Sequence, residues 1–321
     1  MAVDNLDLNG RAWALADACA ARAGELRMAV RPLGNGARVL DAGVTVPGGW
    51  QAGLALADLC MGGLGHLAIV PLSIGGEHWP GVQVWTDHPA IACMASQYAG
   101  WTIDPDGFFA LGSGPIRARA RVEPALFRRL GYAEDGARGV LVLEGRALPT
   151  EDVVEWVSRK SGLMPSGITV AIAPAATLAG GVQVVARVVE TGLHKMDALG
   201  FDVTRVVSAM GTAPLPPTAR DDARAIGRTN DCILYGGQAR YVVRATDEEL
   251  AALVGALPAC ASPDHGTPFH EIFTRHGGDF YAIEPLLFSP AEVWLTSATS
   301  GRTFHAGRLE PDVLRMSLFE R

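Results

Sequence analysis

The segment from Gly180 to Lys195, GGVQVVARVVETGLHK, carries four polar side chains at helical spacing. These are Gln183, Arg187, Glu190 and His194, which fall within roughly 60° of arc on a helix that turns 100° per residue. A glutamate with an arginine one turn before it and a histidine one turn after it can act as a general base. The same pattern also suits an exposed stripe of salt bridges, and spacing alone does not separate the two interpretations.

Three further segments place polar residues beside glycines or at the ends of predicted elements. In LGSGP, Ser113 adds a hydroxyl to a glycine-rich turn, which can bind an anion or a carbonyl group. In TDHPA, Asp87 and His88 end a strand before a helix, where they can bind a ligand or where Asp87 can simply cap the helix. In GRTND, Arg228 and Asn230 occupy an expected helix-to-strand junction, where they either form a polar turn or bind a heteroaromatic ring or a carboxylate.

Strands and helices must position these residues, and their predicted alternation along the chain indicates an α/β fold of mixed sheets. The predicted strands are 37–43, 66–74, 82–86, 139–145, 167–174, 232–237, 239–245, 280–285 and 293–307, the last with a hairpin turn at Ser300-Gly301. The predicted helices are 6–27, 48–61, 89–99, 123–131, 150–161, 180–195, a helix that ends at Gly227, and 247–257. The apolar run at 139–145 is typical of a strand that is buried on both faces. The most natural division gives an N-terminal α/β domain at 1–147 and a C-terminal α/β domain at 148–321.

Composition excludes several classes of protein. The chain has 321 residues, of which 49% are hydrophobic and 19% charged, and its net charge is −7. Such a chain is globular, and its acidity argues against nucleic acid as the main partner. The chain has no run of about 18 apolar residues, so we expect no transmembrane helix, and the N-terminus lacks the pattern of a signal peptide. These two absences predict a soluble cytoplasmic protein. The five cysteines are scattered in apolar surroundings, which predicts buried thiols without disulfides and no zinc site.

Seven segments, in one order from about residue 35 to 293, carry a resemblance to a known family. They read NGARVLDAG, CMGGLG, ACMASQYAGW, FALGSGP, QVVARVVETGLHK, GRTNDCILYGG and GDFYAIEPLLFSPAEV. Together they resemble the methenyltetrahydromethanopterin cyclohydrolases of methanogens and methylotrophic bacteria.

The resemblance implies two α/β domains around a large pocket, often assembled as trimers. It implies a hydrolase of one-carbon metabolism that hydrates the cyclic methenyl group of 5,10-methenyl-tetrahydromethanopterin to the 5-formyl compound, without a metal, nucleotide or other cofactor. The Arg and Glu that the family uses in catalysis correspond to Arg187 and Glu190. We therefore expect a homo-oligomer, a trimer by resemblance, that binds a C1-carrying pterin and neither nucleic acid nor a membrane.

The chemistry of the substrate agrees with these two residues. The methenyl carbon belongs to a cationic amidinium and is already electrophilic, so it needs a base for the attacking water rather than a metal. We expect Glu190 to be that base and Arg187 to orient its carboxylate. For the pterin we expect contacts from Gln97, Tyr98, Ser113, Arg228 and Asn230, with Phe280 or Tyr281 as stacking surfaces. The resemblance assigns no role to His194, which is either a partner that supports the catalytic pair or, as we favour, a structural residue.

Three other functions remain open at this point. A metal-dependent hydrolase would use Asp87, His88 and another histidine. A non-catalytic C1-pterin binding protein would share the fold without turnover, although the presence of both Arg187 and Glu190 argues against it. A nucleotide-binding protein finds little support, because neither GxGxxG after a strand nor a P-loop occurs.

Overall fold

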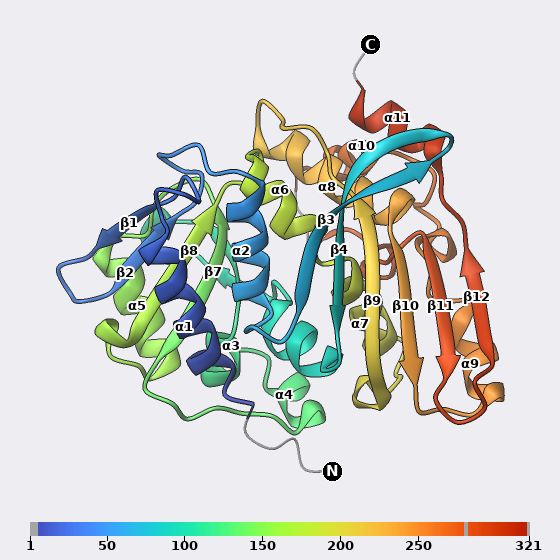
Figure 1. Ribbon diagram of the computed structural model, residues 1–321, viewed down its shortest axis with the longest axis horizontal. Helices are drawn as coiled ribbons and strands as arrows, with labels where there is room; N and C mark the ends of the chain where they lie inside the picture. Colours follow the sequence, from blue (N-terminus) through green and yellow to red (C-terminus); the bar gives the residue numbers. More distant parts are fainter. Residues whose placement is uncertain (1–5, 279–281, 320–321) are drawn as a thin grey trace. The chain divides into compact units, whose positions relative to one another are not determined.

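The computed structural model describes residues 6–278 and 282–319, and it separates into two compact units. The first unit comprises Met1–Gly65 and Ile91–Gln183, and the second comprises His66–Ala90 and Val184–Arg321. Each unit holds one mixed six-stranded sheet with helices, so the predicted α/β class is confirmed (Figure 1). Within the described ranges, no helix is long and apolar enough to cross a bilayer.

The sheet of the first unit has a parallel centre and antiparallel edges. Its strand order is β1-β2-β8-β7-β6-β5, with β2, β8 and β7 parallel to one another. The bounds are Ala29–Pro32 for β1, Arg38–Asp41 for β2, Trp101–Ile103 for β5, Ala110–Ser113 for β6, Gly139–Gly145 for β7 and Ile168–Ala173 for β8. Parallel strands are buried on both faces, which explains why β7 and β8 are continuous apolar runs.

Helices cover both faces of this first sheet. Val140 and Val142 of β7 pack with α1 (Leu8–Ala21) and α2 (Trp50–Cys60) on one face. Leu141 and Leu143 point to the other face, where they pack with α3 (Ile116–Ala120) and α5 (Glu151–Ser161). Helix α4 (Pro124–Leu130) follows α3. The prediction that 139–145 is a strand with two buried faces is therefore confirmed, and it produces three layers.

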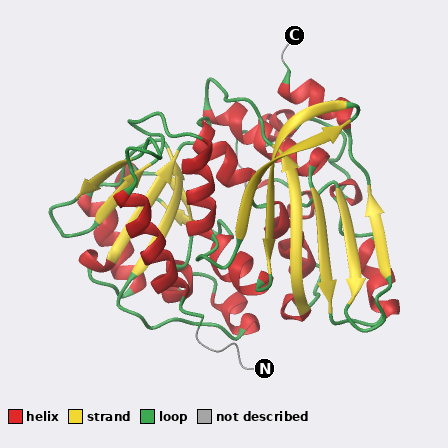
Figure 2. Cartoon of the chain, in the orientation of Figure 1, coloured by secondary structure: helices red, strands yellow, loops and turns green. Residues whose placement is uncertain are grey.

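The second unit has a sheet with strand order β12-β11-β10-β9-β4-β3. Its strands are β3 (His66–Ile74), β4 (Glu77–Thr86), β9 (Val206–Pro214), β10 (Gln238–Val243), β11 (Glu292–Ser297) and β12 (Thr303–Gly307). The helices of this unit are α7 (Val188–Ala198), α8 (Asp222–Gly236), α9 (Asp247–Val254), α10 (Phe269–Arg275) and α11 (Pro311–Leu318) (Figure 2).

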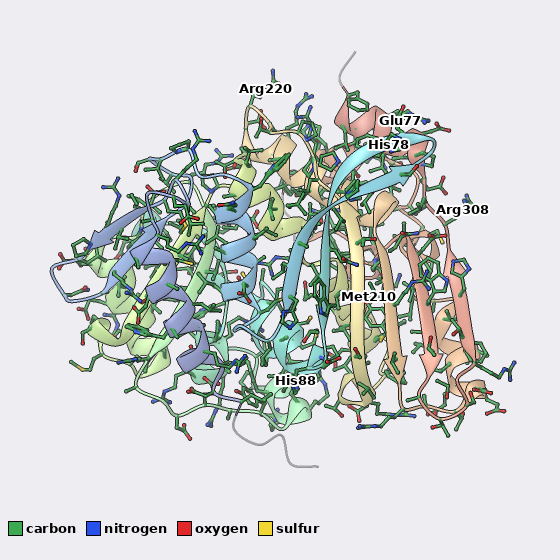
Figure 3. All side chains as sticks on the ribbon, viewed as in Figure 1. Glu77, His78, His88, Met210, Arg220 and Arg308 are labelled. Carbon is green, nitrogen blue, oxygen red and sulfur yellow. The ribbon has the colours of Figure 1, made fainter. Side chains whose placement is uncertain are left out.

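Among the described residues, the helices of this unit pack on one face of the second sheet. Helix α7 packs on β9 and β10, α8 packs on β9, and α9 packs on β11 and β12. Along β10, Tyr241 is buried on the covered face while its neighbour Val242 is exposed on the other. Met210 of β9 shares the exposed face, with 37% of its surface accessible (Figure 3). This one-sided burial is typical of a largely antiparallel sheet.

The two units do not coincide with the domains expected at 1–147 and 148–321. Strand β8 lies in the second predicted domain, yet it pairs in parallel with β7 of the first along its whole length. The hairpin of β3 and β4 lies in the first predicted domain, yet β4 pairs with β9 of the second. Pairing between strands far apart in the sequence thus determines which segments belong to each unit, and each unit is built from separate stretches of the chain.

Three predicted elements differ from the structure. The helix expected over 180–195 is two helices, α6 (Leu178–Val185) and α7, because the amide of Arg187 donates to the carbonyl of Val184 and leaves the α-helical pattern. The strand expected at 232–237 is instead the end of α8. The strand expected at 280–285 falls partly outside the described residues, and its described end is loop that leads into a short 3₁₀ turn, Pro285–Leu287.

The cysteines only partly match the expected core positions. Cys60, Cys93 and Cys232 are buried, Cys19 is half-buried and Cys260 is exposed, and none of the five forms a disulfide. The prediction that every cysteine is a core residue is therefore wrong for Cys260.

Candidate active site

The two predicted catalytic residues open helix α7 in the second unit. Arg187 is the N-cap residue and Glu190 lies in the first helical turn. Their exposed fractions are 7% for Arg187 and 4% for Glu190, so both charged side chains are almost removed from solvent. The N-terminus of a helix carries a partial positive charge, which favours the ionised form of a carboxylate there. The position therefore suits a glutamate that must be charged while largely buried.

Close packing fixes the start of α7 on its sheet. The hydroxyl of Tyr241 in β10 donates to the carbonyl of Val189 at 2.9 Å. This contact requires glycine at position 192, since a Cβ there would collide with the same hydroxyl. Gly211 of β9 likewise leaves room for the side chains of Val188 and Val189. Glu190 thus sits on a helical turn whose backbone has little freedom to move.

A second group of predicted site residues gathers in the first unit. Residues Ala90–Gln97 form a π-helix, η1, and the amide of Tyr98 donates to the carbonyl of Cys93, five residues earlier, at 2.8 Å. The amide of Gly114 donates to the carbonyl of Ser96 at 2.8 Å. This bond joins the end of η1 to the LGSGP turn, so Gln97, Tyr98 and Ser113 lie close together. The π-helix is rare in proteins and frequently marks a functional site.

Buried polar side chains extend this group. The Cys60 sulfur lies 3.4 Å from the Ser113 hydroxyl and 3.8 Å from Oε1 of Gln183. The Ser96 hydroxyl donates to the carbonyl of Cys60 at 2.5 Å, and the Ser113 hydroxyl donates to the carbonyl of Val142 at 3.2 Å. The sequence interpretation missed Cys60 as a member of this group, because its apolar neighbours suggested a core residue. Its place beside the CMGGLG glycines is the signal that could have identified it.

The break after α6 divides the polar stripe that the sequence suggested. Gln183 belongs to the first unit, whereas Arg187, Glu190 and His194 belong to the second. His194 follows Glu190 by one turn of α7 and is half-buried. A continuous helix over 180–195, the premise of the stripe, is therefore wrong, although the spacing of Arg187, Glu190 and His194 holds within α7.

Arg228 and Asn230 lie inside α8 and not at a helix-to-strand junction. Nη1 of Arg228 donates to the carbonyl of Thr218 at 2.9 Å, and its Nε donates to the carbonyl of Ser317 at 3.4 Å. The Asn230 amide donates to the carbonyl of Ile226, one turn earlier, at 2.8 Å. These bonds support a structural role for both residues, and their contact with a pterin stays a prediction. Phe280 and Tyr281, the expected stacking residues, lie outside the described residues.

Asp87 and His88 are exposed at the end of β4, where Figure 3 labels His88. A carboxylate oxygen of Asp87 accepts a hydrogen bond from the Ser208 hydroxyl at 2.7 Å. The amide of His88 donates to the Thr86 hydroxyl oxygen at 3.0 Å. Among residues 6–278 and 282–319, no three His, Cys, Asp or Glu side chains converge in a way that could hold a metal ion. The geometry does not favour the metal-dependent alternative.

Comparison with known proteins gives one consistent result. A family model described as Cyclohydrolase (MCH) matches residues 7–318. The chain is 46% identical over 315 residues to a methenyltetrahydromethanopterin cyclohydrolase of Methylobacterium sp. (strain 4-46), covering 97% of both chains. It is 41% identical over 295 residues to the enzyme of that name from Methanosarcina barkeri, covering 91% of this chain and 92% of the relative. With matches of this extent, the chain belongs to the methenyltetrahydromethanopterin cyclohydrolase family.

Proposed function

We propose that this protein is a hydrolase that reversibly converts 5,10-methenyl-tetrahydromethanopterin into the 5-formyl compound, with Glu190 as general base. Membership of the family supports the substrate and the reaction. The observation that carries the assignment of the base is the position of Glu190, 4% exposed in the first turn of α7 and three residues after Arg187.

The reaction has two steps around one carbon, the addition of water and the opening of the ring. Water attacks the amidinium carbon, a C–O bond forms, and the Glu190 carboxylate takes the proton that the water loses. The resulting hydroxyl adduct then opens as its C–N bond breaks, the hydroxyl loses its proton to become the formyl oxygen, and the leaving nitrogen gains a proton. One proton is released overall. A single carboxylate beside the reacting carbon can serve both steps.

Arg187 acts on Glu190 and the product oxygen rather than on the cation. A guanidinium beside an amidinium would meet repulsion between like charges, so direct binding of the reacting centre is unfavourable. Placed three residues before Glu190, Arg187 can orient the carboxylate and offset its negative charge. It can also donate a hydrogen bond to the oxygen that becomes the formyl group.

The test is the variant Glu190→Gln, which keeps the shape of the side chain and removes the base. We expect turnover, followed by the loss of the methenyl absorbance, to fall by roughly 10²–10⁴-fold while pterin binding changes little. Glu248→Gln is the matched control, since Glu248 also lies in the first turn of a helix, α9, but is exposed. Near-normal turnover by Glu190→Gln would exclude Glu190 as the base.

The same assay separates the remaining functional alternatives. A non-catalytic pterin-binding protein would leave the methenyl absorbance unchanged after mixing. Activity on methenyl-tetrahydrofolate alone would change the substrate while keeping the chemistry. A metal-dependent hydrolase would lose activity with a chelator, whereas we expect turnover without a metal or other cofactor.

We also propose that the protein assembles as a homotrimer, an inference that rests on its family resemblance. Size-exclusion chromatography with light scattering at several concentrations measures the mass directly against the 33.8 kDa of one chain. A mass of one chain at all concentrations would overturn the trimer. A cytoplasmic location likewise stays a prediction.

A further inference from the structure

Arg117 of α3 is among the largest fully buried side chains of the described residues. Arginine is rarely found without solvent contact, because a buried charge requires partners that replace its hydration. Here the partners come from the end of the π-helix η1 and from Glu123. Those contacts connect Arg117 to two of the predicted pterin-binding residues.

The guanidinium of Arg117 closes the C-terminal end of η1. Its Nη1 donates to the carbonyls of Met94 at 3.0 Å and Ser96 at 3.4 Å, and its Nη2 donates to Oε2 of Glu123 at 2.7 Å. The same group lies over the ring of Tyr98, 5.0 Å from its centroid. One side chain therefore contacts the backbone before Gln97 and the ring of the residue after it.

The end of a π-helix needs such a partner. The last carbonyl oxygens of any helix receive no hydrogen bond from an amide of the same helix. They form its negative end, which attracts a cation. In η1 the carbonyl of Ser96 receives the amide of Gly114 as well as Arg117. The amide of Arg117 in turn donates to the carbonyl of Gly114 at 3.2 Å. Arg117 thus connects the end of η1 to Gly114, the residue that directly follows Ser113 at the end of β6.

Stability alone gives a weak reason for a charge at this place. A buried ion pair can often be replaced by apolar residues of similar volume without loss of stability. What apolar side chains cannot do is direct two carbonyls and an aromatic ring into one arrangement. A buried charge with these contacts therefore points to control of geometry.

We propose that Arg117 is a positioning residue for pterin binding, acting through the end of η1 to fix Gln97 and Tyr98. This inference rests on the proposed function, in which these two residues contact the substrate. It assigns no contact between Arg117 and the substrate. Glu123 takes part as the carboxylate that balances and orients the guanidinium.

The test uses Arg117→Met, which keeps most of the volume, together with Arg117→Lys and Glu123→Gln. We expect KM for the methenyl pterin to rise on the order of tenfold or more in Arg117→Met, with kcat within about threefold, because misplaced binding groups weaken capture of the substrate. The lysine variant should recover part of the loss, since an ammonium can still reach a carbonyl. Arg38→Met is the matched control, because Arg38 also stacks on an aromatic ring, Trp13, and pairs with an acid in the same unit.

Hydrogen exchange supplies a measurement that does not depend on turnover. We expect the amides of residues 90–98 to exchange faster in Arg117→Met without substrate, and to be unchanged in Arg38→Met. If the wild-type protein does not convert the pterin but exchange in residues 90–98 still increases in Arg117→Met, the proposed function is wrong, whereas the stabilisation of η1 by Arg117 is supported. Unchanged KM in folded Arg117→Met, with or without a lower melting temperature, would overturn the positioning role.

Discussion

Replacing Asp231 by asparagine should make the stability of this protein less sensitive to pH. Asp231 lies in α8 and is fully buried. Its carboxylate accepts hydrogen bonds from the amide of Phe269 at 2.8 Å and from the hydroxyl of Ser317 at 2.5 Å. Burial nevertheless raises the pKa of Asp231 from 3.8 to about 7, with a further contribution from nearby Glu271. The two hydrogen bonds only partly offset this loss of hydration.

The direction and size of the effect follow from this shift. Between pH 4 and pH 7 the folded state holds a proton on Asp231 that the unfolded state has lost. The stability associated with that proton is fully present below about pH 4 and is lost as the pH rises to 7. At about 1.36 kcal/mol per pKa unit, the free energy of unfolding falls by about 2.5 kcal/mol between pH 5 and pH 8 from this group alone. That corresponds to roughly 5–10 °C in melting temperature for a unit of this size.

The assay is thermal unfolding of wild type and Asp231→Asn at pH 5, 6, 7 and 8. Other titrating groups cancel in the comparison, so the variant should gain stability relative to wild type as the pH rises. Asp221→Asn serves as control, because Asp221 caps the same helix from a half-buried position and its pKa is lowered, chiefly by the amide of Arg224. Parallel curves for wild type and Asp231→Asn would refute the raised pKa and the reasoning from burial.

Two further predictions concern the placement of α7. Gly192→Ala should destabilise the protein by about 1–3 kcal/mol, because the added Cβ would collide with the Tyr241 hydroxyl. In a double-mutant cycle, adding Tyr241→Phe should recover part of that loss. If the effects of the two substitutions on the free energy of unfolding are simply additive, the collision is contradicted. Burial lowers the pKa of Lys195 to about 8, although its ammonium donates to the carbonyl of Pro258 at 2.9 Å. Between about pH 8 and pH 10, Lys195 is therefore protonated in the unfolded state and largely neutral in the folded state, so the stability of the protein should rise with pH in this range. Thermal unfolding of Lys195→Met should lack that rise, and an equal rise in the variant would exclude Lys195 as its source.

The sequence predicted those elements whose local pattern agrees with their packing. Strand β7 is a short apolar run, and the structure buries both of its faces as that pattern requires. Residues 232–236 are another short apolar run that ends in glycine, yet they belong to α8 because their side chains pack on the sheet and its neighbouring helices. Such a run does not by itself distinguish a strand from a buried helical turn, and tertiary contacts decide.

In the candidate site, too, the sequence predicts features that depend on neighbouring residues and misses those that depend on contacts between residues far apart in the chain. Spacing within one helical turn places Arg187 and Glu190 in one polar stripe with Gln183 and His194, and the family resemblance predicts that these two are the catalytic residues. The break between α6 and α7 was missed, because neither proline nor glycine marks residues 186 and 187. Arg117 could not be recognised either: its segment IRARAR suggests a basic surface, and only the fold brings Glu123 and the carbonyls of η1 around it.

The interleaving of the two units also has a consequence for synthesis on the ribosome. The hairpin of β3 and β4 is complete at residue 86, but the strand that pairs with it, β9, begins only at residue 206. At typical rates of translation, roughly ten seconds pass between the two. During that time the first unit can gather its own sheet, ending with β8, while the hairpin presents an unpaired edge of the kind that invites aggregation. Expression of a fragment that stops before β9 should therefore yield aggregated product, and nascent chains of this length are natural clients for chaperones.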